Sequence, residues 1–459
     1  MADAHQRRSL TLFVVSAAIL FDALDLSITQ VALPSIKRDL DLGVAVLAWV
    51  PNAYVLTYGG LLLLGGRAAD LIGRRRVFVT GLALFTAMSL VCGIAPGGGV
   101  LIAARGLQGI GAALTVPASV SIIATTFVEG PERNRALGVF GACASAGFAV
   151  GLVLGGVLTD ALDWRWIFLV KVPAVAAIAL VAARVLDPGL PPDGARRSYD
   201  LPGAVTSAGG LVLGVFVITQ VAERTIAPGA LAAIAAIAIA LLLAFVAWER
   251  RDRDPLLPLD FFALRTPRAA ALASLTVLAA PFGLAYVATL FLQDVQGYSA
   301  LQTGLALLPG AALSAVVSRG LAPAVIDRFG LRVTGVAAML VVAVGFALLL
   351  MIEPGISYAH AMLPAHVICL GLGMGIAYPV FTVAAVTGVD DERQGLAAGI
   401  QSTALQVGGG VGLAVVSAVV AARSAAGADQ VDALRAGVLA GATLPLIGSL
   451  VALVGLPST

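Results

Sequence analysis

The stretch TLFVVSAAILFDALDLSITQVALPSI, residues Thr11–Ile36, decides the class of this protein. It is mostly apolar, and it is longer than the roughly 20 residues that a helix needs to cross a ~30 Å hydrocarbon core. Asp22 and Asp25 lie inside it. A carboxylate at that depth is unfavourable by several kcal/mol unless it faces a partner or a wet cavity. We therefore expect a membrane-spanning helix that carries two functional acids.

The rest of the chain repeats this apolar pattern. Hydrophobic residues make up 59% and charged residues 12% of the chain, which is the balance of a polytopic helical membrane protein. Apolar runs separated by charged or Gly/Pro-rich breaks predict about fourteen spans. The predicted spans are Thr11–Ile36, Val44–Gly66, Val77–Ile94, Val100–Phe127, Ala136–Leu158, Trp166–Val185, Leu201–Val221, Ala227–Trp248, Ala269–Leu292, Leu301–Pro323, Val333–Ile352, Ala359–Val386, Gly395–Ala421 and Ala436–Leu456.

A weak internal repeat suggests how these spans are grouped. The loop GRAADLIGRRR, residues Gly66–Arg76, has an echo in DRFGLR, residues Asp327–Arg332. Parallel six-helix halves that handle substrate at their interface are a pattern of secondary transporters. We expect an N-terminal six-helix bundle over residues 1–186, a linker with two inserted transmembrane helices over 187–268, and a C-terminal six-helix bundle over 269–459.

The distribution of basic residues predicts the orientation. Most of the arginines, including Arg196 and Arg197 of the central linker, fall on one side if the N-terminus is cytoplasmic. Both termini are then cytoplasmic, in a bacterial cytoplasmic membrane, since the abundance of Arg and Ala is typical of a GC-rich bacterial genome. The net charge of +2 gives no reason to expect a nucleic-acid partner.

The loop between the second and third spans is the most specific motif. Gly66 and Gly73 allow two helices to turn tightly, and Asp70 can pair with a cation or cap a helix N-terminus. With Arg74 and Arg75, this loop is predicted to gate the cytoplasmic side. The alternative is that the arginines serve only to fix the topology.

This loop resembles the signature loop of the major facilitator superfamily. Other segments are similar to the fourteen-helix drug:proton antiporter branch of that family, and the resemblance covers nearly the whole chain. These segments are Asp25–Pro34, Leu101–Gly111, Trp164–Leu169 and Phe291–Gly310. The resemblance implies an all-α membrane protein with a major facilitator fold, in which two extra transmembrane helices lie between two six-helix bundles.

Four positions depart from the family pattern. The fifth span has Leu152 where the family usually has a proline before Gly155-Gly156, and Gln30 and Lys171 stand where Asn is common. Leu405 stands where the family often has an Arg. Glycines at every fourth position of the fifth span, Gly147, Gly151 and Gly155, still predict a face for close helix packing.

Proton coupling is assigned to three residues. Arg105 lies in the fourth span, and the resemblance implies that it and Asp25 couple transport to protons. Protonation of a buried acid frees its cation, although a permanent ion pair that only fixes the helices is the alternative. Asp22 lies about 60° around the helix from Asp25, so both acids are expected to face one cavity.

Polar residues within other spans are candidates for the wall of the substrate cavity, and each is an alternative candidate for a helix–helix hydrogen bond. They are Asn52, Tyr54, Tyr58, Gln108, Gln293, Tyr378, Gln401 and Gln406. His366, a lone imidazole in an apolar span, is interpreted as structural, with a proton-relay role as the alternative.

Together these residues predict a proton-coupled secondary transporter that exports amphipathic or cationic small molecules, such as drugs and antibiotics, by alternating access. Its expected partners are a hydrophobic or cationic substrate, protons and the lipid bilayer, with no cofactor and no metal. No phosphate-binding loop and no catalytic constellation occur in the sequence, so we do not expect an enzyme. The alternatives are a dedicated exporter of one natural product or metabolite, and a non-transporting membrane sensor.

Overall fold

The computed structural model describes residues 2–187, 200–223, 226–252, 255–390 and 393–458, and the predicted loop residues Arg196 and Arg197 lie outside these ranges. The described residues are almost entirely helical and contain no β-strand. The helices are α1 (Ala2–Asp39), α2 (Val44–Ile72), α3 (Arg74–Gly93), α4 (Gly98–Thr126), α5 (Pro131–Ala161), α6 (Trp166–Leu169), α7 (Lys171–Val185), α8 (Leu201–Glu223), α9 (Pro228–Glu249), η1 (Leu259–Ala263), α10 (Arg265–Val277), α11 (Ala279–Leu290), η2 (Phe291–Val295), α12 (Ala300–Ala347), η3 (Leu348–Met351), α13 (Met362–His366), η4 (Val367–Met374), α14 (Gly375–Val386), α15 (Gln394–Ala425) and α16 (Gln430–Gly455).

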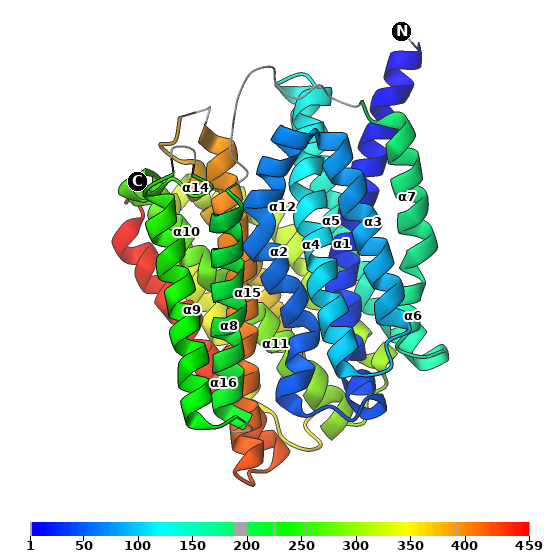
Figure 1. The fold of residues 1–459 in the computed structure, drawn as a ribbon. Helices are drawn as coiled ribbons and strands as arrows, with labels where there is room; N and C mark the ends of the chain where they lie inside the picture. Colours follow the sequence, from blue (N-terminus) through cyan, green and yellow to red (C-terminus); the bar gives the residue numbers. More distant parts are fainter. Residues whose placement is uncertain (1, 188–199, 224–225, 253–254, 391–392, 459) are drawn as a thin grey trace.

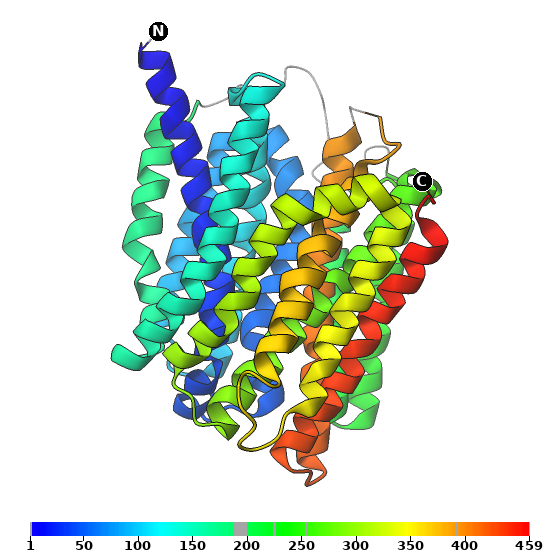
Figure 2. The ribbon, with the colours of Figure 1, turned by 180° about the vertical axis from the view of Figure 1, so that it is seen from behind.

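Thirteen helical segments in the described residues are long and apolar enough to cross a membrane. One of them, Ala300–Met351, has 52 residues. A straight helix of that size is about 78 Å long, more than twice the ~30 Å hydrocarbon core. Figure 2 shows this segment rising through the bundle, turning at the end and descending again. It therefore supplies two passes, and the predicted number of about fourteen holds.

Two glycines make equivalent turns between neighbouring passes. Gly73 separates α2 from α3 with φ 105°, and Gly330 interrupts α12 with φ 73°. Only glycine adopts these positive φ values without strain. Both residues belong to the two copies of the loop motif found in the sequence. Gly66, by contrast, lies inside α2 against Pro117, so the prediction that it forms part of the turn is wrong.

The helices pack as two groups. Helices α1–α7 pack mainly on one another, chiefly α1 on α5 and both α2 and α3 on α4, and we call them the N-terminal bundle. Helices α10–α16 form the C-terminal bundle, centred on α12, α15 and α16. The two bundles meet where α12 packs against α5 and where α15 packs against α2. Both chain termini lie at the same end of the molecule (Figures 1 and 2).

The inserted helices α8 and α9 lie side by side at one edge of the molecule (Figure 1). Helix α8 contacts α2 of one bundle and α15 of the other, and Trp49 Nε1 on α2 donates a 3.2 Å hydrogen bond to Thr219 Oγ1 on α8. Helix α9 packs on α8, and only Ala238 and Glu249 of α9 are buried. The pair therefore covers the α2–α15 contact from outside.

The glycine face of the fifth span packs as the sequence predicts. Gly147, Gly151 and Gly155 on α5 each lie against the α1 backbone, at Leu20, Leu24 and Ile28 respectively. A methyl group at any of the three glycines would overlap α1. Close contact of this kind lets small residues pack two helices tightly in a membrane.

Candidate functional site

A cluster of buried charges lies inside the N-terminal bundle. Asp25 on α1, Arg105 on α4 and Lys171 on α7 are all fully buried. Arg105 Nη1 lies 2.5 Å from Asp25 Oδ2, and Lys171 Nζ pairs with Asp25 Oδ1. The predicted contact between Asp25 and Arg105 is thus present. The single carboxylate faces two cations and ties three helices together.

Neutral groups complete the cluster. Gln108 Nε2 donates to Asp25 Oδ1 at 3.2 Å and to Ser89 Oγ at 2.9 Å, while its Oε1 accepts from Arg105 Nη1 at 2.7 Å. Arg105 Nε donates to the Val50 carbonyl at 3.1 Å. Arg105 therefore has partners on three sides, whereas Asp25 is the only hydrogen-bonding partner of Lys171 among the described residues. These bonds offset part of the unfavourable burial of the charges, while Arg105 Nη2 has no partner among the described residues.

Asp22 joins the cluster through a tyrosine. The Tyr54 hydroxyl donates to Asp22 Oδ1, and the guanidinium of Arg105 lies 4.4 Å from the centre of the Tyr54 ring. If both acids are ionised, two negative and two positive charges balance. If one acid takes a proton, the buried site carries a net positive charge. The four residues therefore form one electrostatic unit.

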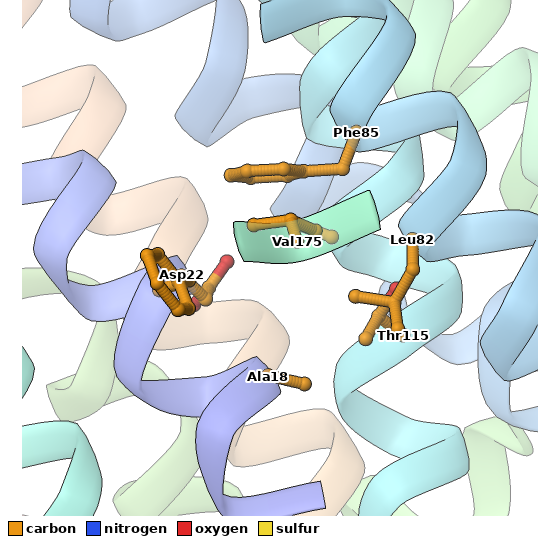
Figure 3. A pocket seen from close by; sticks show the side chains of 8 residues that line it. Ala18, Asp22, Leu82, Phe85, Thr115 and Val175 are labelled. Atoms are coloured by element: carbon orange, nitrogen blue, oxygen red, sulfur yellow. The ribbon is translucent and has the colours of Figure 1, made fainter. Parts of the chain in front are cut away.

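Asp22 borders a separate small pocket (Figure 3). This pocket has a volume of about 10 Å³, which is about one water molecule. Phe85, Thr115 and Val175 form other parts of its wall, so it lies inside the N-terminal bundle. The sequence suggests one cavity for both acids. The structure instead places Asp25 within the ion cluster and Asp22 against this pocket.

A much larger cavity of about 560 Å³ lies between the two bundles. Its wall comes from α1 and α5 on one side and from α11, α12, α13, η4, α14 and α15 on the other. Neither Asp22 nor Asp25 is part of its described wall. Helix α1 nevertheless connects the two sites, because it contributes Ala23, Leu26 and Gln30 to the cavity and Asp25 to the ion cluster.

One end of this cavity is sealed by contacts between the bundles. Asp160, at the end of α5, accepts hydrogen bonds from the backbone N–H groups of Ala300 and Leu301 at 3.0 and 2.9 Å, at the start of α12. Lys37 and Asp294 form an ion pair at 3.2 Å near the same end. The cavity wall extends along α5 and α12 toward the opposite end, which carries both termini.

The eight cavity candidates from the sequence divide into two groups. Tyr378 and Gln406 line the large cavity. The other six lie elsewhere. Gln293 Nε2 donates to the Val31 carbonyl at 2.8 Å, and Gln401 Nε2 donates to Thr382 Oγ1 at 3.0 Å. Gln108 and Tyr54 belong to the ion cluster, Tyr58 packs on the Tyr54 ring, and Asn52 is buried. For Gln108, Gln293 and Gln401 the structure places the amide in helix–helix hydrogen bonds, the alternative noted above.

The predicted gating loop lies at the end of the molecule away from the Asp160 contact. Asp70 is exposed and forms no hydrogen bond or ion pair with the described residues. Arg75 Nη2 donates to the Ala183 carbonyl near the end of α7. The loop is thus anchored by Arg75, while the Asp70 carboxylate is available for a partner in another conformation.

Lys171 is the residue that sequence reasoning missed. It was noted only as a departure from the family pattern. Its signal was nonetheless present, since it is a lone lysine within the apolar span Trp166–Val185. The rule that singled out Asp22, Asp25 and Arg105 applies equally to such a lysine.

Comparisons with known proteins agree with this architecture. The chain is 40% identical to the puromycin resistance protein pur8 of Streptomyces alboniger, over 92% of this chain and 83% of that protein. It is also 40% identical to the cephamycin export protein CmcT of Amycolatopsis lactamdurans, over 85% of this chain and 81% of that protein. A bacterial homologue of the lysosomal transporter Spinster, solved in an inward-facing conformation, has the same fold, with a TM-score of 0.66, 16% identity and coverage of 98% and 97%. The sequence profile of the Major Facilitator Superfamily matches residues 15–413, and the chain belongs to this superfamily of multi-pass membrane transporters.

Proposed function

We propose that this protein exports amphipathic or cationic small molecules, including antibiotics, across a bacterial cytoplasmic membrane in exchange for protons. The export of drugs is supported by the relatives, which are described as a puromycin resistance protein and a cephamycin export protein. Because each of these is described by a single antibiotic, a dedicated exporter of one natural product is the second candidate.

The observation that carries proton exchange is the double role of α1. Asp25 on this helix holds two buried cations, while Gln30 on the same helix lines the large cavity. Protonation of Asp25 would leave Arg105 and Lys171 without the carboxylate that pairs with both of them. An unpaired buried charge is unfavourable by about 3–5 kcal/mol, which is enough to shift an equilibrium between two packings of α1. The cavity wall would then move with the proton.

The proposed cycle alternates between two cavity openings. In the present conformation the end near Asp160 is closed, and the cavity extends toward the end that carries the termini. The positive-inside distribution of arginines supports placing that end in the cytoplasm. On this orientation the cavity is ready to receive substrate from the cytoplasm, and the loop around Asp70 and Gly73 acts as the gate on that side.

The test is transport into inside-out vesicles under an imposed pH gradient. Wild-type protein should accumulate ethidium inside the vesicles, and collapse of the gradient should abolish this accumulation. Asp25→Asn should reduce the initial rate roughly a hundredfold, because the neutral amide cannot hold two cations or carry a proton. Asp432→Asn, which removes an exposed acid outside the ion cluster and the cavity wall, is the matched control and should retain most activity. Accumulation by Asp25→Asn at the wild-type rate, at equal protein level, would overturn the coupling role.

A further inference from the structure

Five neutral polar side chains in the wall of the large cavity form no hydrogen bond with the part of the chain that the structure describes. They are Gln30 on α1, Ser314 and Ser318 on α12, Tyr378 on α14 and Gln406 on α15. In the spans discussed above, by contrast, Gln108, Gln293 and Gln401 all have partners. Hydrogen-bonding side chains without a partner among the described residues therefore lie in the cavity wall.

His366 is the most constrained of the polar residues in this wall. Its side chain is 1% exposed, and Nδ1 lies 2.9 Å from the Met362 carbonyl. A carbonyl oxygen only accepts hydrogen bonds, so Nδ1 carries the proton in this contact. In the neutral imidazole, Nε2 then bears a lone pair and acts as an acceptor. Nε2 is buried and has no partner among the described residues.

The surroundings of His366 favour the neutral ring. Arg319 is the only charged residue in the described cavity wall, and no carboxylate lines it. Apart from Arg319 and His366, Tyr378 is the only titratable side chain in the described part of that wall. A second proton on His366 would add a cation to a wall that contains no counter-charge among the described residues. The structure therefore places an unpartnered acceptor on a residue of the cavity wall, with the Nε2 atom covered in this conformation, and a buried acceptor without a donor is unfavourable until a donor arrives.

The backbone holds this acceptor in a fixed place. Gly310 on α12 packs directly against the backbone of His366, where a larger residue would not fit. The π-helical segment η4 begins at the next residue, Val367. Such segments are rare, and they occur frequently at functional sites.

We propose that His366 is a substrate-recognition residue, whose Nε2 accepts a hydrogen bond from an N–H or O–H group of the transported amphipath. This inference rests on the proposed export function and specifies its substrate class. The apolar wall, which includes Phe148 and Phe282, takes the hydrophobic part of the molecule. Amphipaths that carry a donor are preferred over those that carry none.

The test compares two lipophilic monocations that differ in donors. Ethidium carries primary aromatic amines, and tetraphenylphosphonium has no N–H or O–H group. Equilibrium binding of both to the purified protein would be measured in wild type, His366→Asn and His366→Gln. The Asn side chain reaches the Nδ1 position only, whereas the Gln side chain reaches the Nε2 position. His360→Asn, at an exposed histidine between η3 and α13, is the matched control.

His366→Asn should raise the Kd for ethidium about tenfold, the effect of one lost hydrogen bond, and leave the Kd for tetraphenylphosphonium within about twofold. His366→Gln should hold the Kd for ethidium within about threefold of wild type. If His366→Asn does not fold, His366→Met, which fills the volume of the ring without a strong acceptor, takes its place with the same expected result. Equal changes for the two dyes in His366→Asn or His366→Met, or no change for either dye in that variant, would overturn the role of His366 alone. A wild-type protein that binds neither dye would overturn the proposed function and this inference together.

Discussion

The two bundles of this transporter use polar chemistry in opposite ways. The N-terminal bundle buries Asp22, Asp25, Arg105 and Lys171 in one connected unit. The described residues of the C-terminal bundle bury no carboxylate, lysine or arginine. Its buried polar groups are neutral side chains. Some of them bond between helices, as at Gln401, and His366 lies at the cavity wall.

This difference suggests a division of labour. Buried charges respond strongly to a proton but tolerate little change in their partners. Neutral hydrogen-bonding groups and apolar walls can accept varied ligands, because each contact contributes only about 1 kcal/mol. We expect changes in the N-terminal bundle to affect every substrate and changes in the C-terminal bundle to affect some substrates.

The largest expected effect separates the two cations around Asp25. Arg105→Ala removes hydrogen bonds to Asp25, Gln108 and Val50, so it should destabilise the protein by about 3–5 kcal/mol and stop transport of every substrate. Lys171→Met removes one ion pair and leaves Arg105 in place on Asp25, so it should destabilise the protein less. Thermal unfolding of both purified variants measures the order, and a greater loss of stability in Lys171→Met would contradict it.

A smaller effect is expected where the bundles meet. A methyl group at Gly156 would lie within 3 Å of backbone atoms of Ala300 and Leu301, so Gly156→Ala should hinder closure of the sealed end by about 1–3 kcal/mol. We expect increased thiol labelling of a cysteine placed at Leu301. Gly320→Ala, on α12 with open space beside it and outside the described cavity wall, is the control and should label like wild type. Equal labelling of the two variants would mean that this glycine does not control closure.

The smallest effect concerns the neutral cavity wall. Tyr378→Phe and Gln406→Leu each remove a polar group without touching the ion cluster. The apparent affinity for individual substrates should change by a few-fold, about 1 kcal/mol, while the dependence of transport on the pH gradient stays as in wild type. Vesicle uptake of several dyes at two gradient values measures both quantities. A changed gradient dependence would break the proposed separation between the bundles.

Much of this arrangement could be predicted because the hydrocarbon core constrains the composition of each span separately. The spans, the acids and Arg105 follow from hydropathy and from the unfavourable burial of charge in hydrocarbon. The glycine face on α5 follows from four-residue spacing. Lys171 could have been predicted by the same rule.

Which polar residues meet, and which remain free, could not be predicted. Gln108, Gln401 and Gln406 look alike in the sequence, yet Gln108 binds Asp25, Gln401 bonds Thr382 and Gln406 lines the cavity. The sequence likewise could not predict that Asp22 lies outside the described wall of the large cavity. Helical spacing limits which face a side chain occupies, but the packing of α1 against its neighbours decides what that face meets.

By itself, the sequence determined that this is a many-spanning helical membrane protein with charged groups at depth, because each span must bury its backbone hydrogen bonds within itself and each charge stands out against apolar neighbours. Only the tertiary structure decided that one carboxylate holds two cations, that a cavity of about 560 Å³ lies apart from them, and that the Nε2 atom of His366 is left without a partner at its wall. These features depend on how distant helices approach one another, and helix packing is set by the sum of many small contacts along whole interfaces.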